Sequence, residues 1–357
     1  MKSLRTLIAA GILAWGTAFT IPAAQAEDTL YLFNWTEYMS PEIIKQFEAK
    51  YHCKVVQSYY NSLGGMLAKL KAGGDSQYDV VVPSDYFIPR LVHEGLLMKL
   101  DPADIPNLKN LLPQFKSPSY DPNNAYSVPY QWGTTGIAYN DLKIKSPPAS
   151  WGILFDPKVN PDYPFSMMGG SGMETVGAAC AYLGDGFSCK GEKDWVAAAK
   201  LLTKTEKRKN FTGFQNGTPA LHQLESGILS AAMVYNGDFA YGMAKDPKAF
   251  AHLKFILPKE GAHVWVDNMA IPAHAPHPKL AMEFINFILD PKVGAELSNY
   301  NHYASPNAAS KPYLDPVLKS PLITPTAAEW KRLHYLPAIM GKDLQTYDQI
   351  WTAVRAQ

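Results

Sequence analysis

The sequence has little net charge and, after its first 26 residues, no long hydrophobic run. Its 357 residues include 33 Lys and Arg against 32 Asp and Glu, a formal net charge of +1. A chain so close to neutral has no bulk attraction to nucleic acids or anionic membranes, and it contains no basic run. No later stretch is long and apolar enough for a transmembrane helix. We therefore expect a soluble protein without a nucleic-acid partner.

Common enzyme motifs are missing too. The chain has no Gly-x-Ser-x-Gly elbow, no His-Glu-x-x-His helix and no phosphate-binding loop. His274 and His277 fall in a proline-rich turn, where we expect them to be solvated and not bound to metal. We therefore expect a binding protein that uses no cofactor and no metal. One enzymatic alternative stays open, because Glu174 and Asp267 could form a glycosidase-like pair of carboxylates.

Only three cysteines occur, and none has the spacing of a zinc ligand. Cys180 and Cys189 are nine positions apart on either side of a glycine-containing turn, so they could close a short loop at the end of a helix. An oxidising compartment permits such a disulfide, but the sequence leaves the bonded and free states equally open. If the two are paired, Cys53 is the odd cysteine, and we expect it to be buried.

The first 26 residues have the pattern of an export signal. Lys2 and Arg5 give a positive start, residues 7–20 are apolar, and residues 24–26 read Ala-Gln-Ala, as at a cleavage site. We expect cleavage after residue 26; the alternative is an uncleaved anchor. Since no cysteine follows, we expect a free periplasmic protein and no lipid anchor. Removing 26 of the 357 residues leaves 331, more than a single core usually supports, so we expect two lobes.

Strand-like and helix-like segments alternate along the chain, which is typical of an α/β fold. Extended segments at 126–139 and 264–271 look like two passages between lobes. Two such crossings make a hinge, and the cleft between hinged lobes is a common site for a small ligand. We expect the following division: 1–26 signal peptide, 27–137 and 268–322 lobe 1, and 138–267 and 323–357 lobe 2 with a C-terminal helical wrap.

Four short segments at strand ends combine aromatic residues with carboxylates or hydroxyls, namely 34–38, 83–86, 235–238 and 265–267. Ligands of open α/β sheets bind beyond the carboxyl ends of the strands, so all four segments could face one cleft. Aromatic faces attract ammonium groups by roughly 0.5–2 kcal/mol per contact, and a buried ammonium also needs a carboxylate. Each buried methylene adds about 0.8 kcal/mol. The pattern therefore favours a small organic cation, and a diamine fits it well.

Each of these residues also has a purely structural interpretation. Asp238 could cap the helix that follows it, and Glu174 could be a first-turn carboxylate that favours the helix dipole. A tryptophan close to an aspartate in the chain, such as Trp265 two residues before Asp267, is often part of ordinary core packing.

Five stretches together give a more specific signal: Phe-Asn-Trp-Thr-Glu-Tyr at 33–38, Tyr-Asp-Val-Val-Val-Pro-Ser at 78–84, Val-Pro-Tyr-Gln-Trp-Gly at 128–133, Trp-Val-Asp-Asn-Met-Ala-Ile-Pro at 265–272 and Tyr-Ala-Ser-Pro-Asn at 303–307. With these stretches the chain resembles the periplasmic spermidine/putrescine-binding proteins of ABC transporters over essentially its whole length after residue 26. The resemblance implies a two-lobed periplasmic-binding-protein fold (type II) with a polyamine in the interlobe cleft. It also implies the permease subunits of an ABC importer as partners, and we expect a monomer.

The resemblance implies aromatic and hydroxyl contacts for five residues. Trp35 and Tyr38 would be aromatic walls of the site. Ser84 and Tyr86 would line the side of lobe 1. Trp265 would stack on the methylene chain of the ligand.

It implies charged contacts as well. Glu174 would hold one terminal ammonium group, and Asp267 would be the principal acid for the other. Asp238 resembles an acid that putrescine-selective members carry. Tyr303 would also contact the ligand, and Tyr235 occupies a position where the family has tryptophan.

Two departures from the family pattern bear on the choice of amine. Ser171 stands where family members have an aspartate, and Tyr235 replaces the tryptophan. With three acids still present, we expect a short diamine to be preferred over spermidine. Alternatives that stay open are the same fold with an amino acid derivative, another amine or ferric iron as ligand, and a sensor role.

Overall fold

A computed structural model of the protein describes residues 28–170 and 172–356. The expected signal peptide lies outside these residues, and so does Ser171. Among the described residues, no helix combines the length and the apolar character needed to cross a membrane.

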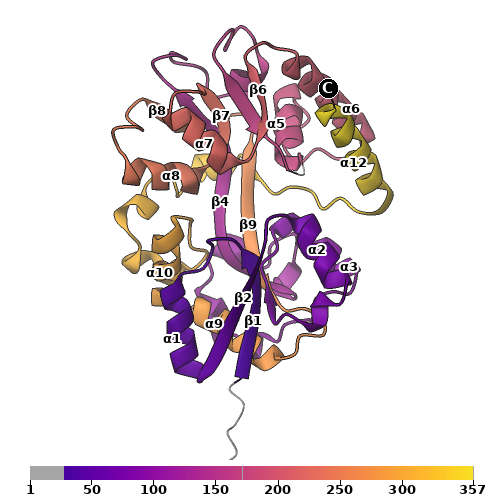
Figure 1. Ribbon diagram of the computed structural model, residues 1–357, viewed down its shortest axis with the longest axis vertical. Coiled ribbons are helices and arrows are strands. Elements are labelled where there is room, and N and C mark those ends of the chain that lie inside the picture. Colours follow the sequence, from indigo (N-terminus) through magenta and orange to yellow (C-terminus); the bar gives the residue numbers. More distant parts are fainter. Residues whose placement is uncertain (1–27, 171, 357) are drawn as a thin grey trace, which may run out of the picture.

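The described chain folds into two lobes joined by two long strands (Figure 1). Lobe 1, at the bottom of Figure 1, contains β1 (Asp28–Trp35), α1 (Pro41–Tyr51), β2 (Cys53–Tyr60), α2 (Leu63–Lys71), β3 (Val80–Val81), the 3₁₀ helix η2 (Asp85–Phe87), α3 (Ile88–His93), α9 (Pro278–Ile288) and α10 (Pro291–Asn301). Lobe 2 contains α4 (Gly152–Phe155), β5 (Phe165–Met168), α5 (Met173–Leu183), α6 (Glu192–Glu206), β6 (Phe211–Gln215), α7 (Gly217–Glu225), β7 (Ala231–Tyr235), α8 (Asn236–Lys245), β8 (Leu253–Ile256) and α12 (Gly341–Arg355). The joining strands are β4 (Ser127–Asn140) and β9 (Ala262–Ala270).

Shorter elements fill the connections. They are η1 (Gly74–Ser76), η3 (Pro102–Asp104), η4 (Pro106–Asn110), η5 (Pro113–Phe115), η6 (Pro122–Asn124), η7 (Ala308–Tyr313), η8 (Pro316–Lys319), α11 (Ala327–Trp330) and β10 (Leu333–His334).

Local sequence explains where the first helix begins and how it packs. The side chain of Ser40 accepts a hydrogen bond from the backbone N–H of Glu42, and Pro41 occupies the first turn, where its missing N–H costs nothing. Phe47, on the buried face of α1, packs edge-on against Phe284 of α9 with ring centroids 5.0 Å apart. Each fully buried aromatic side chain of this kind contributes roughly 1.5–3 kcal/mol.

The strand order is β2-β1-β3-β9-β4-β7-β5-β6, with β10 and β8 paired beside β9 and β4. In lobe 1, β1 runs parallel to β2 and β3, and β9 is antiparallel to β3. In lobe 2, β4 is antiparallel to β7, which runs parallel to β5. Strands β4 and β9 are therefore the antiparallel crossings that the sequence predicts, and we call them the hinge strands.

The expected boundaries at 137/138 and 267/268 fall inside the hinge strands, so dividing the chain at these residues remains a proposal. After lobe 1 the C-terminal segment returns to lobe 2 (Figure 1), where α12 packs on α6 with the rings of Trp195 and Tyr347 5.4 Å apart. The indole Nε1 of Trp351 donates to the carbonyl of Gly170 at 3.1 Å.

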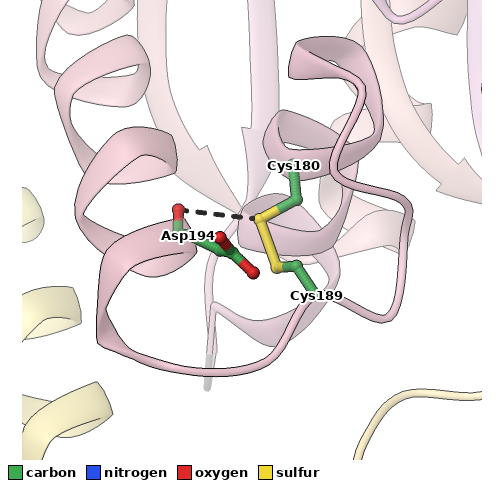
Figure 2. Close-up of a disulfide and its surroundings, with 3 residues drawn as sticks. All are labelled: Cys180, Cys189 and Asp194. Atoms are coloured by element: carbon green, nitrogen blue, oxygen red, sulfur yellow. Dashed lines mark hydrogen bonds between the residues drawn. A yellow bond between two sulfur atoms is a disulfide. The ribbon is translucent and has the colours of Figure 1, made fainter.

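Cys180 and Cys189 form a disulfide with their Cα atoms 6.2 Å apart, so the bonded alternative is the one the structure has (Figure 2). The bond ties the last turn of α5 to the segment that leads into α6. The Cys180 Sγ atom lies 3.9 Å from the backbone carbonyl oxygen of Asp194 in α6, the contact drawn as a dashed line in Figure 2. Cys53 is buried and not disulfide-bonded, as expected.

Candidate ligand-binding site

One face of the hinge strands brings together much of the candidate site. Alternate residues of a strand share a face, so His263, Trp265 and Asp267 of β9 point to the same side. Their directly paired partners on β4 are Thr135, Gly133 and Gln131 respectively.

Trp265 lies across the hinge strands because the residue opposite it has no side chain. A Cβ atom on Gly133 would lie 2.4 Å from the indole ring, so only glycine allows this approach. The indole is 8% exposed and packs edge-on against Tyr303 and Tyr235, with ring centroids 4.9 and 5.7 Å apart. Within the described part of the chain, its Nε1–H has no hydrogen-bond partner. Trp265 therefore offers an aromatic face at the junction of the lobes.

Asp267 is a buried carboxylate held by two hydroxyls of lobe 1. Ser84, after β3, donates to Oδ1 at 2.5 Å, and Tyr38, after β1, donates to Oδ2 at 3.0 Å. Burial raises the pKa of Asp267 to about 6, while these two hydrogen bonds oppose the shift. Near neutral pH the group is therefore an anion that retains free acceptor capacity.

Glu174 is the corresponding carboxylate of lobe 2, in the first turn of α5. Its Oε1 accepts from Thr135 Oγ1 at 2.6 Å and lies 2.8 Å from His263 Nδ1, and its Oε2 accepts from the Tyr235 hydroxyl at 3.3 Å. These donors come from neighbouring strands, because Thr135 pairs with both Tyr235 and His263. The helix dipole alone does not explain the position of Glu174.

Asp238 forms a link between the lobes. It lies in the first turn of α8, where it accepts hydrogen bonds from Thr218 Oγ1 at 2.6 Å and from the hydroxyl of Tyr303, which follows α10 of lobe 1. The approach is close, because a Cβ atom on Gly237 would lie 2.2 Å from the Tyr303 ring. The capping interpretation of Asp238 is wrong: α8 has Tyr235 at its N-cap and no side-chain cap.

The charges of all three carboxylates act on the hydroxyl of Tyr235. Burial raises the pKa of the Tyr235 hydroxyl well above its ordinary value, and the charges of Glu174, Asp238 and Asp267 raise it further. All three acids thus lie within electrostatic range of one hydroxyl. In residues 28–170 and 172–356, none of the three has a lysine or arginine partner. The result is a group of three carboxylates beside aromatic rings, with the imidazole of His263 as their ionisable neighbour.

Tyr86 joins this group, but Trp35 is less directly connected. Tyr86 packs against the apolar cores of both lobes and lies within electrostatic range of Tyr235. Trp35 donates from Nε1 to the carbonyl of Val82 at 3.0 Å and packs on Tyr60, with ring centroids 4.5 Å apart. No described contact joins Trp35 to the three carboxylates.

Sequence reasoning missed the partners of these acids. Thr135, Thr218 and His263 become visible only when strands and helices from distant parts of the chain are paired. His263 had one available signal, its position two residues before Trp265 and directly before the predicted strand at 264–271.

Asp85 was also missed as a special residue. The side chain of Asp85, which lies between Ser84 and Tyr86 in the sequence, is fully buried. Its Oδ1 accepts a hydrogen bond from the backbone N–H of Val266 at 3.4 Å, and its Oδ2 has no partner among the described residues. Burial raises its pKa to about 7, partly offset by His263. Asp85 is therefore protonated at neutral pH to a far larger extent than an ordinary aspartate.

Of the two histidines of the proline-rich turn, only His274 is solvated as expected. His274 is exposed and lies 2.7 Å from Asp75, while His277 is half-buried beside Asp79. Across the described ranges, no group of three His, Cys, Asp or Glu residues is arranged to hold a metal ion.

Comparison with known proteins places this arrangement in a family. Residues 42–328 match the bacterial extracellular solute-binding proteins. The chain belongs to this family.

Individual relatives agree with that assignment. The chain is 37% identical to the spermidine/putrescine-binding periplasmic protein of Salmonella typhimurium, over 88% of this chain and 87% of the relative. It is 32% identical to the putrescine/cadaverine-binding protein of Pseudomonas aeruginosa, over 93% and 95%. A solved structure described as a putative spermidine/putrescine ABC transporter from Listeria monocytogenes superimposes with a TM-score of 0.81 at 29% identity, over 92% of this chain and 99% of that one.

These findings confirm the resemblance and the two-lobed α/β fold expected from the sequence. The family and its relatives are solute-binding components of transporters. This membership, and not the lack of a motif, decides against the glycosidase alternative for Glu174 and Asp267.

Proposed function

We propose that this protein binds a polyamine between its lobes in the periplasm and delivers it to the permease of an ABC importer. One observation carries the proposal: Asp267, Glu174 and Asp238 are each held by hydroxyl donors around Trp265, without a lysine or arginine partner in the described residues. Such a group of carboxylates needs a cation from outside the chain.

The chemistry of the site fits an amine with more than one charge. The hydroxyls use part of the acceptor capacity of each carboxylate, and an ammonium group with three N–H donors can take the rest. The Trp265 face suits the methylenes between the charged groups, each worth about 0.8 kcal/mol when buried. Micromolar binding requires about −8 kcal/mol net of ordering costs, and two charge-assisted contacts and a buried methylene chain contribute toward it.

The roles of the ten site residues belong to this proposal. Asp267 takes one ammonium group, Glu174 takes the other, and Asp238 adds charge at the edge of the site. The remaining residues surround the ligand with rings and hydroxyls: Trp35, Tyr38, Ser84, Tyr86, Tyr235, Trp265 and Tyr303.

A short diamine is the preferred ligand in this proposal. Tyr303 and Asp238 link the lobes directly beside Trp265, which limits the length available along the indole. The sequence also has serine at position 171, where the resemblance would give another acid for a third amine. Putrescine, with four methylenes between two ammonium groups, meets these limits better than spermidine.

The proposed polyamine ligand also implies where the protein acts and how it passes the ligand on. We infer that the signal-like N-terminus directs the chain to the periplasm and that the protein acts as a monomer whose lobes close over the ligand. The permease would then recognise the closed form, as hinge closure around a ligand permits.

Calorimetric titration of ligand-stripped protein tests the proposal. Protein purified after removal of residues 1–26, unfolded, dialysed and refolded, is titrated with putrescine, cadaverine, spermidine and agmatine. Micromolar or tighter binding that is strongest for putrescine or cadaverine supports the proposal. Stronger binding of spermidine retains the polyamine and removes the diamine preference. No binding of any amine by protein with native circular dichroism overturns the proposed ligand class.

A further inference from the structure

We propose that His263 is a positioning residue that orients Glu174 toward the second ammonium group of the ligand. The inference rests on the proposed function, since it names a further residue that sets how that site recognises a diamine.

The imidazole of His263 is fixed by its surroundings. The side chain is 2% exposed, and its ring stacks on Phe187 with centroids 6.1 Å apart and planes 12° from parallel. Its backbone is paired on both sides, with Thr135 of β4 and with His334 of β10. A ring held in this way has little freedom to rotate, so it offers its nitrogen atoms in defined directions.

The direction of the hydrogen bond follows from the partner. An ionised carboxylate only accepts, so the His263 Nδ1 atom, 2.8 Å from Glu174 Oε1, must carry the hydrogen. This holds for the neutral and the protonated ring alike. His263 therefore acts as a fixed Nδ1–H donor, whatever happens at Nε2, which is buried without a partner among the described residues.

That donor distinguishes the two oxygens of Glu174. Oε1 accepts from both Thr135 and His263, at 2.6 and 2.8 Å, whereas Oε2 accepts only from Tyr235, at 3.3 Å. A carboxylate offers about four acceptor positions, two on each oxygen, so Oε1 is filled and Oε2 keeps a free one. The ligand ammonium therefore meets Oε2.

Without the histidine, this orientation would be lost. The terminal torsion of a glutamate has a broad energy minimum, so one short hydrogen bond from Thr135 does not hold the carboxylate plane. Hydrogen bonds to charged groups are worth about 1.5–3 kcal/mol, which corresponds to roughly 10- to 100-fold in affinity if the orientation is needed for binding.

A set of substitutions at one position tests this role with putrescine as the probe. His263→Leu keeps the volume but removes the donor, and it should weaken putrescine binding by roughly 10-fold or more. His263→Asn places an amide N–H where Nδ1 was and should restore affinity to within about threefold. His263→Gln places the amide at the position of Nε2, so it should bind as weakly as the leucine variant. Equal affinity of the Asn and Gln variants would overturn the proposal.

A double-mutant cycle shows whether His263 acts through Glu174. Glu174→Gln should weaken putrescine binding, and adding His263→Leu to it should cause less than about a twofold further loss, because coupled residues are not additive. Independent, multiplicative losses would contradict the inference. If the leucine variant folds poorly, the His263→Gln variant, which should also lack the donor at Nδ1, can replace it in the cycle.

The outcomes separate this inference from the proposed function. If the unmodified protein binds no polyamine, the proposed function fails and the inference fails with it. If it binds putrescine and His263→Leu, shown to be folded, binds equally well, only the role of His263 is wrong. A monoamine of the same length, butylamine, adds a check: the ratio of the putrescine to the butylamine affinity should fall in His263→Leu and stay unchanged in His263→Asn.

Discussion

Oγ of Ser84 lies 2.5 Å from Oδ1 of Asp267, so a residue that follows a lobe 1 strand donates a hydrogen bond to a carboxylate on a hinge strand. Tyr38 donates to the other oxygen at 3.0 Å. Asp267 is thereby held in position by groups of the protein itself, with one donor on each oxygen and one acceptor position free on each. A site organised in advance saves the ligand part of the ordering cost of binding.

Asp267→Asn should weaken putrescine binding by about 100-fold or more. Removing one partner of a buried charge pair costs about 2–5 kcal/mol, because the ammonium would then be buried without its counter-ion. Titration calorimetry measures the loss. The thermal unfolding midpoint of the variant serves as the control and should not decrease, since the amide fits the same space without a buried charge. Unchanged affinity would exclude Asp267 as the principal acid.

The affinity for a diamine should fall at acidic pH. Since burial raises the pKa of Asp267 to about 6, the carboxylate becomes protonated below that pH, while aliphatic ammonium groups stay charged. Binding requires the ionised form, so affinity should be constant above pH 7 and should decrease by up to about tenfold per pH unit well below pH 6. Titrations from pH 4.5 to 8 check this expectation. The Asp267→Asn variant should lack this part of the pH dependence, and an equally steep curve in the variant would assign it to another group.

The sequence predicts local features of this molecule better than pairings between distant segments. Helix α1 begins at Pro41, where Ser40 and Pro41 are strong signals of a helix start in the local sequence. Asp267 stood out because a carboxylate close to aromatic residues is chemically unusual, whereas the ligand role of Glu174 was implied only by the family resemblance.

Their hydroxyl and imidazole partners could not be predicted in the same way. Thr135 reaches Glu174 only through the register of β4 with β7 and β9, and that register depends on residues about 100 positions away. The bond between Tyr303 and Asp238 depends on how two lobes meet, which no local pattern encodes. The sequence likewise could not decide whether Cys180 and Cys189 are bonded, because this depends on how close the end of α5 lies to the segment before α6.

Asp85→Asn should change how stability depends on pH. The pKa of Asp85 is about 7 in the folded protein and near 3.8 when unfolded, so the folded state binds more protons between these values. The free energy of unfolding should therefore decrease as pH rises from about 4 to about 7, by up to roughly 4 kcal/mol from this group. Denaturant titrations of both proteins across this range isolate its share, and the variant should show a flatter curve. Parallel curves would mean that Asp85 keeps its ordinary pKa.

Loss of the disulfide should lower stability without removing binding. The loop closed by Cys180 and Cys189 spans nine residues, for which loop-closure entropy gives about 2–3 kcal/mol. The Cys180→Ala/Cys189→Ala variant should lose that much in chemical denaturation. A reductant should destabilise the unmodified protein by a similar amount and leave the variant unaffected. Putrescine affinity should change less than about threefold, because Glu174 lies at the opposite end of α5; a reductant effect on the variant would contradict this assignment.

Gly133→Ala should damage the site by displacing its central aromatic residue. A Cβ atom at this position would lie 2.4 Å from the indole of Trp265 and 2.7 Å from Oδ1 of Asn236. Gly133 is paired directly with Trp265 in the ladder of the two hinge strands, so its backbone cannot easily move away. Overpacking of this kind costs about 1–3 kcal/mol in stability, and the displaced indole should weaken putrescine binding by roughly 10-fold.

Gly64→Ala is the matched control for that substitution. A Cβ atom on Gly64, in α2, meets no heavy atom within 4 Å, so the same added methyl group causes no clash there. The control should raise stability by roughly 0.5–1 kcal/mol, since alanine favours a helix over glycine, and it should leave putrescine affinity unchanged. If Gly133→Ala behaved like this control, Trp265 would have room to move aside, and the close packing of the indole across the hinge strands would not be what holds it in place. The two variants thus separate the general effect of replacing a glycine from the specific effect of crowding Trp265.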